Sequence, residues 1–228
     1  MTSDHDPARS ASMRGMALLY PQADLRPTKL ELLAPWLPGR SWYRGPAAPA
    51  LTRVAGYRFD DPAGEVGIET LLVRAEDGPV YQVPLTYRGA PLDGAEAWLV
   101  GTSDHSVLGP RWIYDACGDP VYAGALASAM ATGAAGAEEY AEIDGRQVRR
   151  EPSMTVRGSG ASGAPVPAVT TIVRVQDGDP TVIVTDAVEL AVRRVLDGAG
   201  DAGRPGPAVL TGTWDGQLPP ARLAAIRD

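Results

Sequence analysis

The stretch that decides the fold is VGIETLLVRAEDGPVYQVPLTY, residues 66–87. Its two apolar segments, 66–74 and 80–87, are separated by Asp77-Gly78, a residue pair that favours a β-hairpin turn. In the second segment, apolar and aromatic residues alternate with polar residues and Pro84, which is typical of a strand in a sheet with one buried face. Because proline cannot donate to a strand ladder, Pro84 predicts that this strand lies at a sheet edge or carries a bulge.

More strands and two helices are predicted around this hairpin. Residues 52–59 and 95–101 have the apolar content of strands. Helix 28–36 begins with a capping box, and helix 119–132 begins with an Asp-Pro pair that caps its first turn. We therefore predict an α+β fold with a mostly antiparallel sheet, two helices packed on one face and a second, largely β segment.

The chain divides at the glycine- and alanine-rich stretch 133–136. We predict a flexible lead-in over residues 1–26, an α+β domain over 27–133 and a β-rich segment over 137–228. The periodicity of 181–196 fits both a strand and a helix, and the alternation of its apolar residues favours a strand. Other strands are expected where apolar runs lie between Asp-Gly and Pro-Gly turns, at 139–143, 147–150, 169–175 and 209–214.

Composition and charge exclude several classes of protein. The net charge is −7 and the pI about 4.9, and the arginines are scattered, so no basic stripe exists to bind nucleic acid. No apolar run approaches the roughly 18–20 residues of a membrane span. Residues 1–12 lack the pattern of a secretory signal, so we expect a cytoplasmic protein without membrane contact. With Cys117 as the single cysteine and two histidines in all, we expect no disulfide, no metal site and no cofactor.

Three features come close to excluding an active kinase. Residues 158–163, GSGASG, match a G-x-G-x-x-G loop, but the prolines that follow at 165 and 167 forbid the helix that a dinucleotide site needs. Pro165 also stands where a kinase loop has valine. The chain has no asparagine and a single lysine, Lys29, whereas kinases use a lysine to hold phosphates and an asparagine to hold magnesium. We interpret 158–163 as a flexible surface loop.

Four polar residues between 104 and 119 are the remaining candidates for catalytic chemistry. Asp104 and His105 could act as a general acid–base pair, with Asp115 close in sequence. The alternative is a turn histidine, with Asp119 used as a helix cap. The alternative is favoured because adjacent residues seldom face one another.

Four aromatic residues are candidates for ligand binding: Trp42, Tyr43, Trp112 and Tyr114. Exposed Trp and Tyr rings can stack on a glycan. The alternative is that these rings fill the core, because the chain has a single phenylalanine and each large aromatic side chain buries about 150–250 Å². The core interpretation is favoured, and a core Trp112 would cost about 3–5 kcal/mol of stability when replaced by alanine.

Two motifs resemble the N-terminal cap of bacterial maltokinases and of trehalose synthase–maltokinase fusions. The first is LPGRSWYRG, residues 37–45, which keeps the Leu-Pro, Trp-Tyr and glycine of the caps but has Ser41 where arginine is usual. The second is YDACGDP, residues 114–120, with its Tyr-Asp-Ala and helix-opening Asp-Pro. The resemblance covers about residues 28–132. Residues 81–92 also resemble short stand-alone actinobacterial cap-like proteins, often labelled α-glucan branching proteins.

The resemblance implies a class of protein rather than an activity. A maltokinase cap is an α+β domain that packs beside the kinase N-lobe and supplies neither nucleotide nor sugar ligands. The resemblance thus implies a stand-alone, non-catalytic cap-like protein linked to trehalose, maltose and α-glucan metabolism, with a kinase or an α-glucan enzyme as its protein partner. Arg193 stands where a kinase strand has its lysine, so 137–228 resembles a degenerate kinase N-lobe. A glycan- or small-molecule-binding domain and an enzyme centred on His105 remain alternatives.

Overall fold

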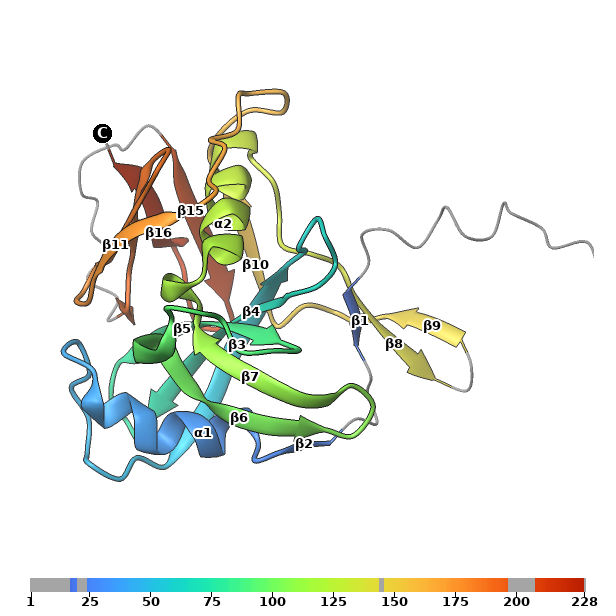
Figure 1. Ribbon diagram of the computed structural model, residues 1–228, viewed down its shortest axis with the longest axis vertical. Helices are drawn as coiled ribbons and strands as arrows, with labels where there is room; N and C mark the ends of the chain where they lie inside the picture. Colours follow the sequence, from blue (N-terminus) through green and yellow to red (C-terminus); the bar gives the residue numbers. More distant parts are fainter. Residues whose placement is uncertain (1–16, 20–23, 144–145, 197–207, 228) are drawn as a thin grey trace, which may run out of the picture.

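The computed structural model describes residues 17–19, 24–143, 146–196 and 208–227 (Figure 1). These residues form two α-helices and three β-sheets in which nearly all strand pairs are antiparallel. The predicted α+β class, with mostly antiparallel sheets, two helices and a largely β second segment, is confirmed. Within the described part of the chain, neither helix combines the length and the apolar character needed to span a membrane.

The large sheet contains the hairpin predicted from residues 66–87. Ile68 pairs with Thr86, and Arg74 pairs with Val80. A short strand from late in the chain, β14 (Val195–Leu196), pairs with the other side of the hairpin's second strand. The order of the remaining strands is β2 (Leu25–Arg26), β6 (Leu99–His105), β7 (Gly109–Asp115), β5 (Val80–Arg88), β4 (Gly67–Ala75) and β3 (Leu51–Phe59).

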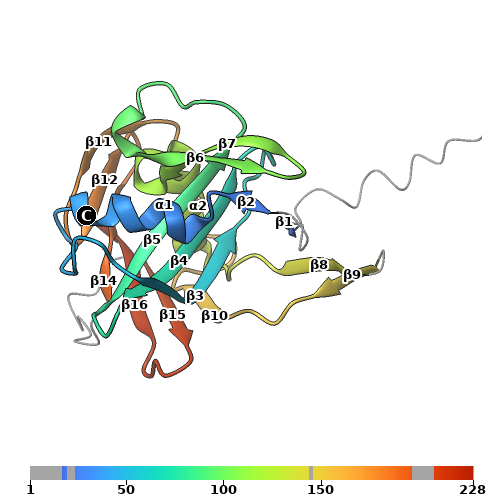
Figure 2. The same ribbon diagram turned by 90° about the horizontal axis from the view of Figure 1, so that it is seen from below.

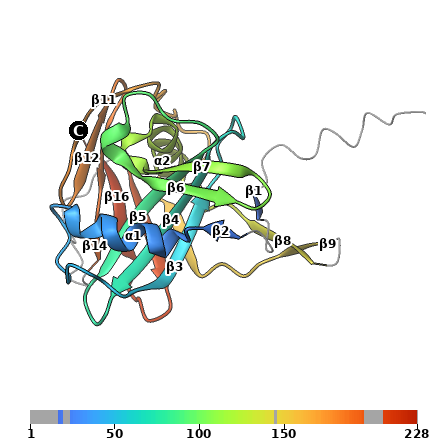
Figure 3. The same ribbon diagram turned by 60° about the horizontal axis from the view of Figure 1, so that its bottom comes forward.

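The other two sheets use mainly residues from the second half of the chain. A small sheet of β1 (Ala17–Leu19), β8 (Glu139–Ile143) and β9 (Arg146–Arg149) projects from the rest of the molecule (Figure 3). The larger of the two, called the second sheet below, is antiparallel throughout. Its strand order is β10 (Met154–Gly158), β15 (Val209–Trp214), β16 (Ala221–Arg227), β13 (Glu189–Val192), β12 (Thr181–Thr185) and β11 (Ile172–Gln176).

The two helices lie on opposite faces of the large sheet, not on one face (Figures 1 and 2). Helix α1 (Lys29–Trp36) packs on the face that carries Leu71 of β4. Helix α2 (Pro120–Thr132) packs on the face that carries Leu72, and the second sheet closes over its far side. Neighbouring residues of a strand point to opposite faces. β4 is therefore buried on both sides, which agrees with its three consecutive apolar residues, 71–73.

Both helix starts follow their predicted chemistry. The Thr28 hydroxyl accepts a hydrogen bond from the backbone N–H of Glu31, whose carboxylate accepts one in return from the Thr28 N–H. The Asp119 side chain accepts from the Val121 N–H at 3.0 Å. Gly133, with φ of 70°, ends α2 in the left-handed conformation, which glycine adopts without steric cost.

β5 is an interior strand, which corrects the prediction that Pro84 marks an edge or a bulge. Pro84 lies opposite Thr70 of β4. On the other side of β5, the pairing with β14 covers residues 80–81 and the pairing with β7 covers 85–88. Pro84 falls between these two partners, so its missing N–H removes no ladder hydrogen bond.

The parts of the chain on either side of the glycine-rich stretch share one core. Leu72 of β4, Leu126 of α2 and Ile183 of β12 belong to the same buried cluster. The Gln82 side chain amide of β5 donates to the carbonyl oxygen of Leu223 in β16 at 3.0 Å. Helix α2 is therefore a central layer between two sheets, and each sheet buries one face against it.

The prediction of a flexible surface loop over 158–163 is wrong for its first glycines, which pack against the end of α2, whereas residues 161–163 are exposed. The Gly160 N–H donates to the Met130 carbonyl at 2.9 Å. A Cβ on Gly160 would lie 1.8 Å from the Ala131 carbonyl oxygen, and one on Gly158 would lie 1.9 Å from that of Ala129. The glycines are therefore required by the close approach of two backbones.

Several strands differ from those predicted. Residues 95–101 contain a 3₁₀ turn, η3 (Glu96–Trp98), followed by β6. Strands β7, β10 and β16 are additional to the predicted ones. The regular parts of 181–196 are strands. Two short strands, β1 and β2, occur within the expected lead-in. Residues 1–16, 20–23 and the predicted turn at Asp144-Gly145 lie outside the described residues.

Candidate functional site

Asp104 and His105 lie at the end of β6, beside its turn into β7. His105 Nδ1 accepts hydrogen bonds from two backbone N–H groups of this turn, at 3.2 and 3.1 Å. Burial, helped by the positive charges of Arg111 and Lys29, lowers the pKa of the imidazole. Because Asp104 and His105 are neighbours on a strand, their side chains point to opposite faces. The structure does not bring them together as an acid–base pair.

Asp115, the third candidate for catalysis, forms a buried ion pair. Its carboxylate accepts two hydrogen bonds from Arg194 Nη2, at 2.9 Å to Oδ1 and 2.7 Å to Oδ2. Both side chains are 0% exposed. Burial alone would lower the pKa of the Arg194 guanidinium, but the charge of Asp115 outweighs it and raises this pKa. The pair joins the end of β7 to the segment between β13 and β14.

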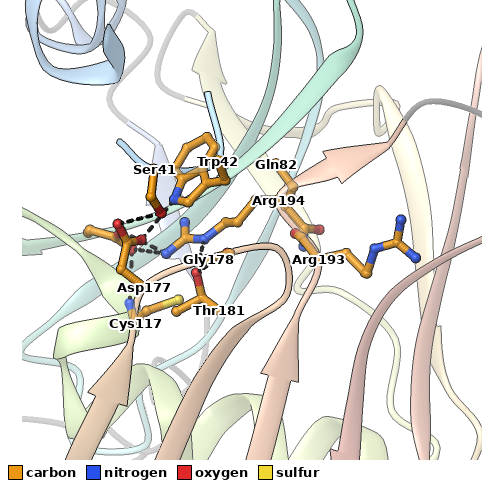
Figure 4. Close-up of polar contacts among 10 residues, drawn as sticks. Ser41, Trp42, Gln82, Cys117, Asp177, Gly178, Thr181, Arg193 and Arg194 are labelled. Carbon is orange, nitrogen blue, oxygen red and sulfur yellow. Dashed lines mark hydrogen bonds and ion pairs between the residues drawn. The ribbon is translucent and has the colours of Figure 1, made fainter. Parts of the chain in front are cut away.

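Arg194 is the centre of a wider network at the junction of the two sheets (Figure 4). Its Nε donates to the Thr181 hydroxyl at 2.8 Å, and its guanidinium lies 5.0 Å from the centre of the Trp42 ring. The indole N–H of Trp42 donates to Asp177 at 2.9 Å, and the Ser41 hydroxyl donates to the same carboxylate at 3.1 Å. The network therefore ties the first of the two cap-like motifs to the β11–β12 turn.

The four aromatic candidates do not form one surface. Trp42 is 3% exposed and packs beside α1, and Tyr43 lies half-buried with its ring 5.0 Å from that of Tyr81. Tyr114 is 2% exposed, and its hydroxyl accepts from a backbone N–H at 2.9 Å. Trp112 is half-buried on the same side of β7 as Tyr114, opposite the face that α1 covers. Burial leaves Trp42 and Tyr114 no ring face for stacking on a sugar.

Asp119 combines its capping role with a second ion pair. Arg88 donates to its two carboxylate oxygens through Nε and Nη2, both at 2.7 Å. The hydrogen bonds to Asp119 raise the pKa of Arg88. Among the described residues no group of three or more His, Cys, Asp or Glu side chains is arranged to hold a metal ion.

A groove of about 940 Å³ runs along the side of α2 that carries Gly124, Ala125 and Ser128, between the faces that pack against the two sheets. Its floor is the small-residue face of the helix, with Gly124, Ala125 and Ser128. The end of β3 and the turn that follows it line the groove together with residues 134–138, whose Ala137 N–H donates to the Arg58 carbonyl at 2.9 Å. Val166 and Val169 complete the lining. The groove is therefore built from both halves of the chain and is open to an extended or helical segment.

Carboxylates lie at the rim of this groove. Asp61 is committed to its own turn, because its oxygens accept three backbone N–H groups. Glu138 pairs with Arg149 at 3.0 Å. Asp60, by contrast, forms no hydrogen bond or ion pair within the described part of the chain; partial burial raises its pKa, and the charge of Arg58 opposes this rise. The rim thus offers one carboxylate to an incoming cation.

Sequence reasoning missed Arg194, Asp177, the groove and its carboxylate. Arg194 gave one signal, which was an Arg-Arg pair inside an apolar strand pattern. A buried charge needs a partner, and Asp115, at the end of β7, is the matching carboxylate. The groove gives no local signal, because its walls come from three separate stretches of the chain.

Residues 36–119 match the family model of the maltokinase N-terminal cap domain. The matched range begins at the end of α1, includes β3 to β7 and closes at the residue that caps α2. This part of the chain is therefore a maltokinase N-terminal cap-like domain, and it links the chain to maltokinase-related maltose and trehalose metabolism. Helix α2 and the second sheet lie beyond the matched range. No curated protein matches the sequence.

Proposed function

We propose that the chain is a cytoplasmic, non-catalytic interaction module that docks on another protein of maltose, trehalose or α-glucan metabolism. The observation that carries this proposal is the groove along α2, lined by residues of the cap-like domain and by residues beyond it. The predicted catalytic residues support it as well. Asp115 is held in a buried ion pair and His105 in a turn, so both have structural roles.

The groove indicates the chemistry of its occupant. Small side chains on the floor, such as Gly124 and Ala125, let a partner backbone approach closely, and apolar side chains can fill the remaining depth. A lysine or arginine at one end of the partner segment would pair with Asp60, which lines the rim of the groove and has no ion-pair partner among the described residues. The proposed partner segment therefore carries apolar side chains and one basic residue.

A substitution in the floor of the groove tests the proposal. Ser128→Arg places a long cation among the groove-lining side chains, whereas Ala131→Arg makes the same charge change on the same helix outside the groove. Tagged wild type should enrich an enzyme of maltose, trehalose or α-glucan metabolism from native cytosol. Ser128→Arg should lose this enrichment, and Ala131→Arg should keep it.

Two results would contradict the proposal. One is wild-type enrichment of no such enzyme above an untagged background. The other is equal enrichment by wild type and by a folded Ser128→Arg variant, because a blocked groove cannot hold the same partner. The substitution Asp60→Asn, which removes the negative charge at the rim, should weaken the enrichment without abolishing it, because the apolar contacts remain.

A further inference from the structure

Three cations surround one buried carboxylate on the face of the large sheet opposite the groove. Lys29 Nζ donates to Glu69 Oε2, and Arg58 Nη1 lies 3.8 Å from the same oxygen. Arg53 Nη2 lies 3.9 Å from Oε1. The Tyr87 hydroxyl donates to Oε2 at 3.1 Å. Three positive charges against one negative charge leave the cluster with an excess of two positive charges, in a chain whose net charge is −7.

The backbone makes room for this concentration of charge. Arg53 and Arg58 belong to β3 and Glu69 to β4, and Arg58 lies directly opposite Glu69 in the register. A Cβ on Gly56 would meet the Arg53 guanidinium at 2.9 Å, and one on Gly67 would lie 3.7 Å from Arg58 Nη2. The Arg53 guanidinium therefore occupies space over the sheet that a side chain at Gly56 would fill, and Arg58 lies in ordinary contact distance beside Gly67.

The cluster is open on its outer side. The side chain of Glu69 is 5% exposed and that of Arg58 14%, whereas Lys29 is 30% and Arg53 46% exposed. The Arg58 Nε is buried and has no hydrogen-bond acceptor among the described residues. Asp60 is influenced by the charge of Arg58 but forms no ion pair with it within the described part of the chain. Glu69 alone therefore does not satisfy the donors gathered around it.

We propose that Lys29, Arg53 and Arg58 form a binding site for the phosphate group of a small phosphate monoester. Arginine presents a planar set of donors that matches phosphate oxygens, and charge-assisted hydrogen bonds of this kind are about twice as strong as neutral ones. A phosphate monoester carries a charge of about −1.5 to −2 at neutral pH. This matches the excess of two positive charges, whereas a single carboxylate would leave about half of it uncompensated.

The single lysine of the chain provides a direct probe. Reductive methylation with ¹³C-formaldehyde gives Lys29 one dimethylamine signal and keeps its positive charge, while the N-terminal amine is the other site of labelling. Inorganic phosphate, glucose 6-phosphate and acetate are then titrated at constant ionic strength. The Lys29 signal should shift saturably with both phosphates. The affinity for acetate, taken from the same titration, should be about tenfold lower. Tighter binding of glucose 6-phosphate than of free phosphate would support the monoester. Binding of glucose 6-phosphate no tighter than that of free phosphate would overturn the monoester assignment.

Matched variants separate binding from general charge effects. Arg53→Gln removes a half-exposed member of the cluster and should weaken phosphate binding about tenfold. Arg174→Gln makes the same change at an exposed position of β11, in the other large sheet, and should leave binding unchanged. Glu69→Gln raises the excess positive charge and should tighten binding. Two results would overturn the proposal: no saturable shift in wild type, or equal affinities of wild type and Arg53→Gln. Because Arg53 is exposed, this test remains available even if Glu69→Gln does not fold.

Discussion

Replacing Asp115 with asparagine tests how strongly the two halves of the molecule are joined. The substituted amide side chain would keep the shape of the carboxylate and an oxygen that can accept from the Cys117 N–H, as Asp115 does at 3.1 Å. It would remove the charge that compensates Arg194, and both members of the pair are 0% exposed. Arg194 would keep its bond to Thr181 and its contact with the Trp42 ring, but neither carries a negative charge.

The expected loss is large. Removing one partner of a buried ion pair typically costs about 3–5 kcal/mol, because the other charge stays buried and uncompensated. Typical domains have only about 5–15 kcal/mol of total stability. With a urea slope of about 1–3 kcal/mol per molar, the unfolding midpoint of Asp115→Asn should fall by at least about 1 M. The measurement is urea unfolding followed by tryptophan fluorescence and by circular dichroism.

A double variant supplies the control for this prediction. Asp115→Leu combined with Arg194→Met replaces both charges by apolar side chains, a change that is often neutral or stabilising at buried pairs. The double variant should therefore be more stable than Asp115→Asn. A loss below about 1 kcal/mol in Asp115→Asn would refute the reasoning, because it would mean that Arg194 reaches solvent. Separate transitions for the two optical probes in wild type would contradict the shared core.

Three further predictions concern stability. Gly160→Ala should cost about 1–3 kcal/mol, because its Cβ would collide with a helix carbonyl, whereas Gly39→Ala, with open space around its Cβ, should be close to neutral in the same melts. The ion pairs of Glu69 outweigh its burial and hold its pKa near 2, against an ordinary value of 4.5. The stabilisation by ionised Glu69 is present at pH values above the ordinary pKa and is lost as the pH falls through about 2. The difference in stability between wild type and Glu69→Gln should therefore shrink from pH 5 to pH 2, and a constant difference would contradict this. Trp112→Ala should cost less than Trp42→Ala, for which we expect about 3–5 kcal/mol, because Trp112 is half-buried and outside both core clusters; equal shifts in melting temperature would speak against this ranking.

The features that sequence predicts correctly are those set by neighbouring residues. Thr28 caps α1 and Asp119 caps α2, because each cap needs only side chains and backbone within one turn. The β4–β5 hairpin follows from an Asp-Gly pair between two apolar segments. The cap-like domain was visible for a related reason, since its two motifs are short and contiguous.

Features that depend on distant contacts could not be predicted. Asp115 and Arg194 are 79 residues apart in sequence, so nothing local identifies the aspartate as a structural partner rather than a catalytic acid. The face to which each helix packs depends on whether β4 is buried on one side or both, and its apolar run fits a strand of either kind. Pro84 shows the same limit, because its place between two partner strands is decided by β14, more than a hundred residues later.

The central claim, that this chain docks on a metabolic enzyme through the groove along α2, is tested most directly by site-specific cross-linking. A photoreactive amino acid is placed at position 128 in the groove floor and, in a second variant, at position 131 on the same helix outside the groove. Illumination in native cytosol is followed by mass spectrometry of the cross-linked products. We predict cross-links from position 128, and not from 131, to an apolar segment with a basic residue in an enzyme of maltose, trehalose or α-glucan metabolism. Identical products from both positions, or no product from position 128, would contradict the claim.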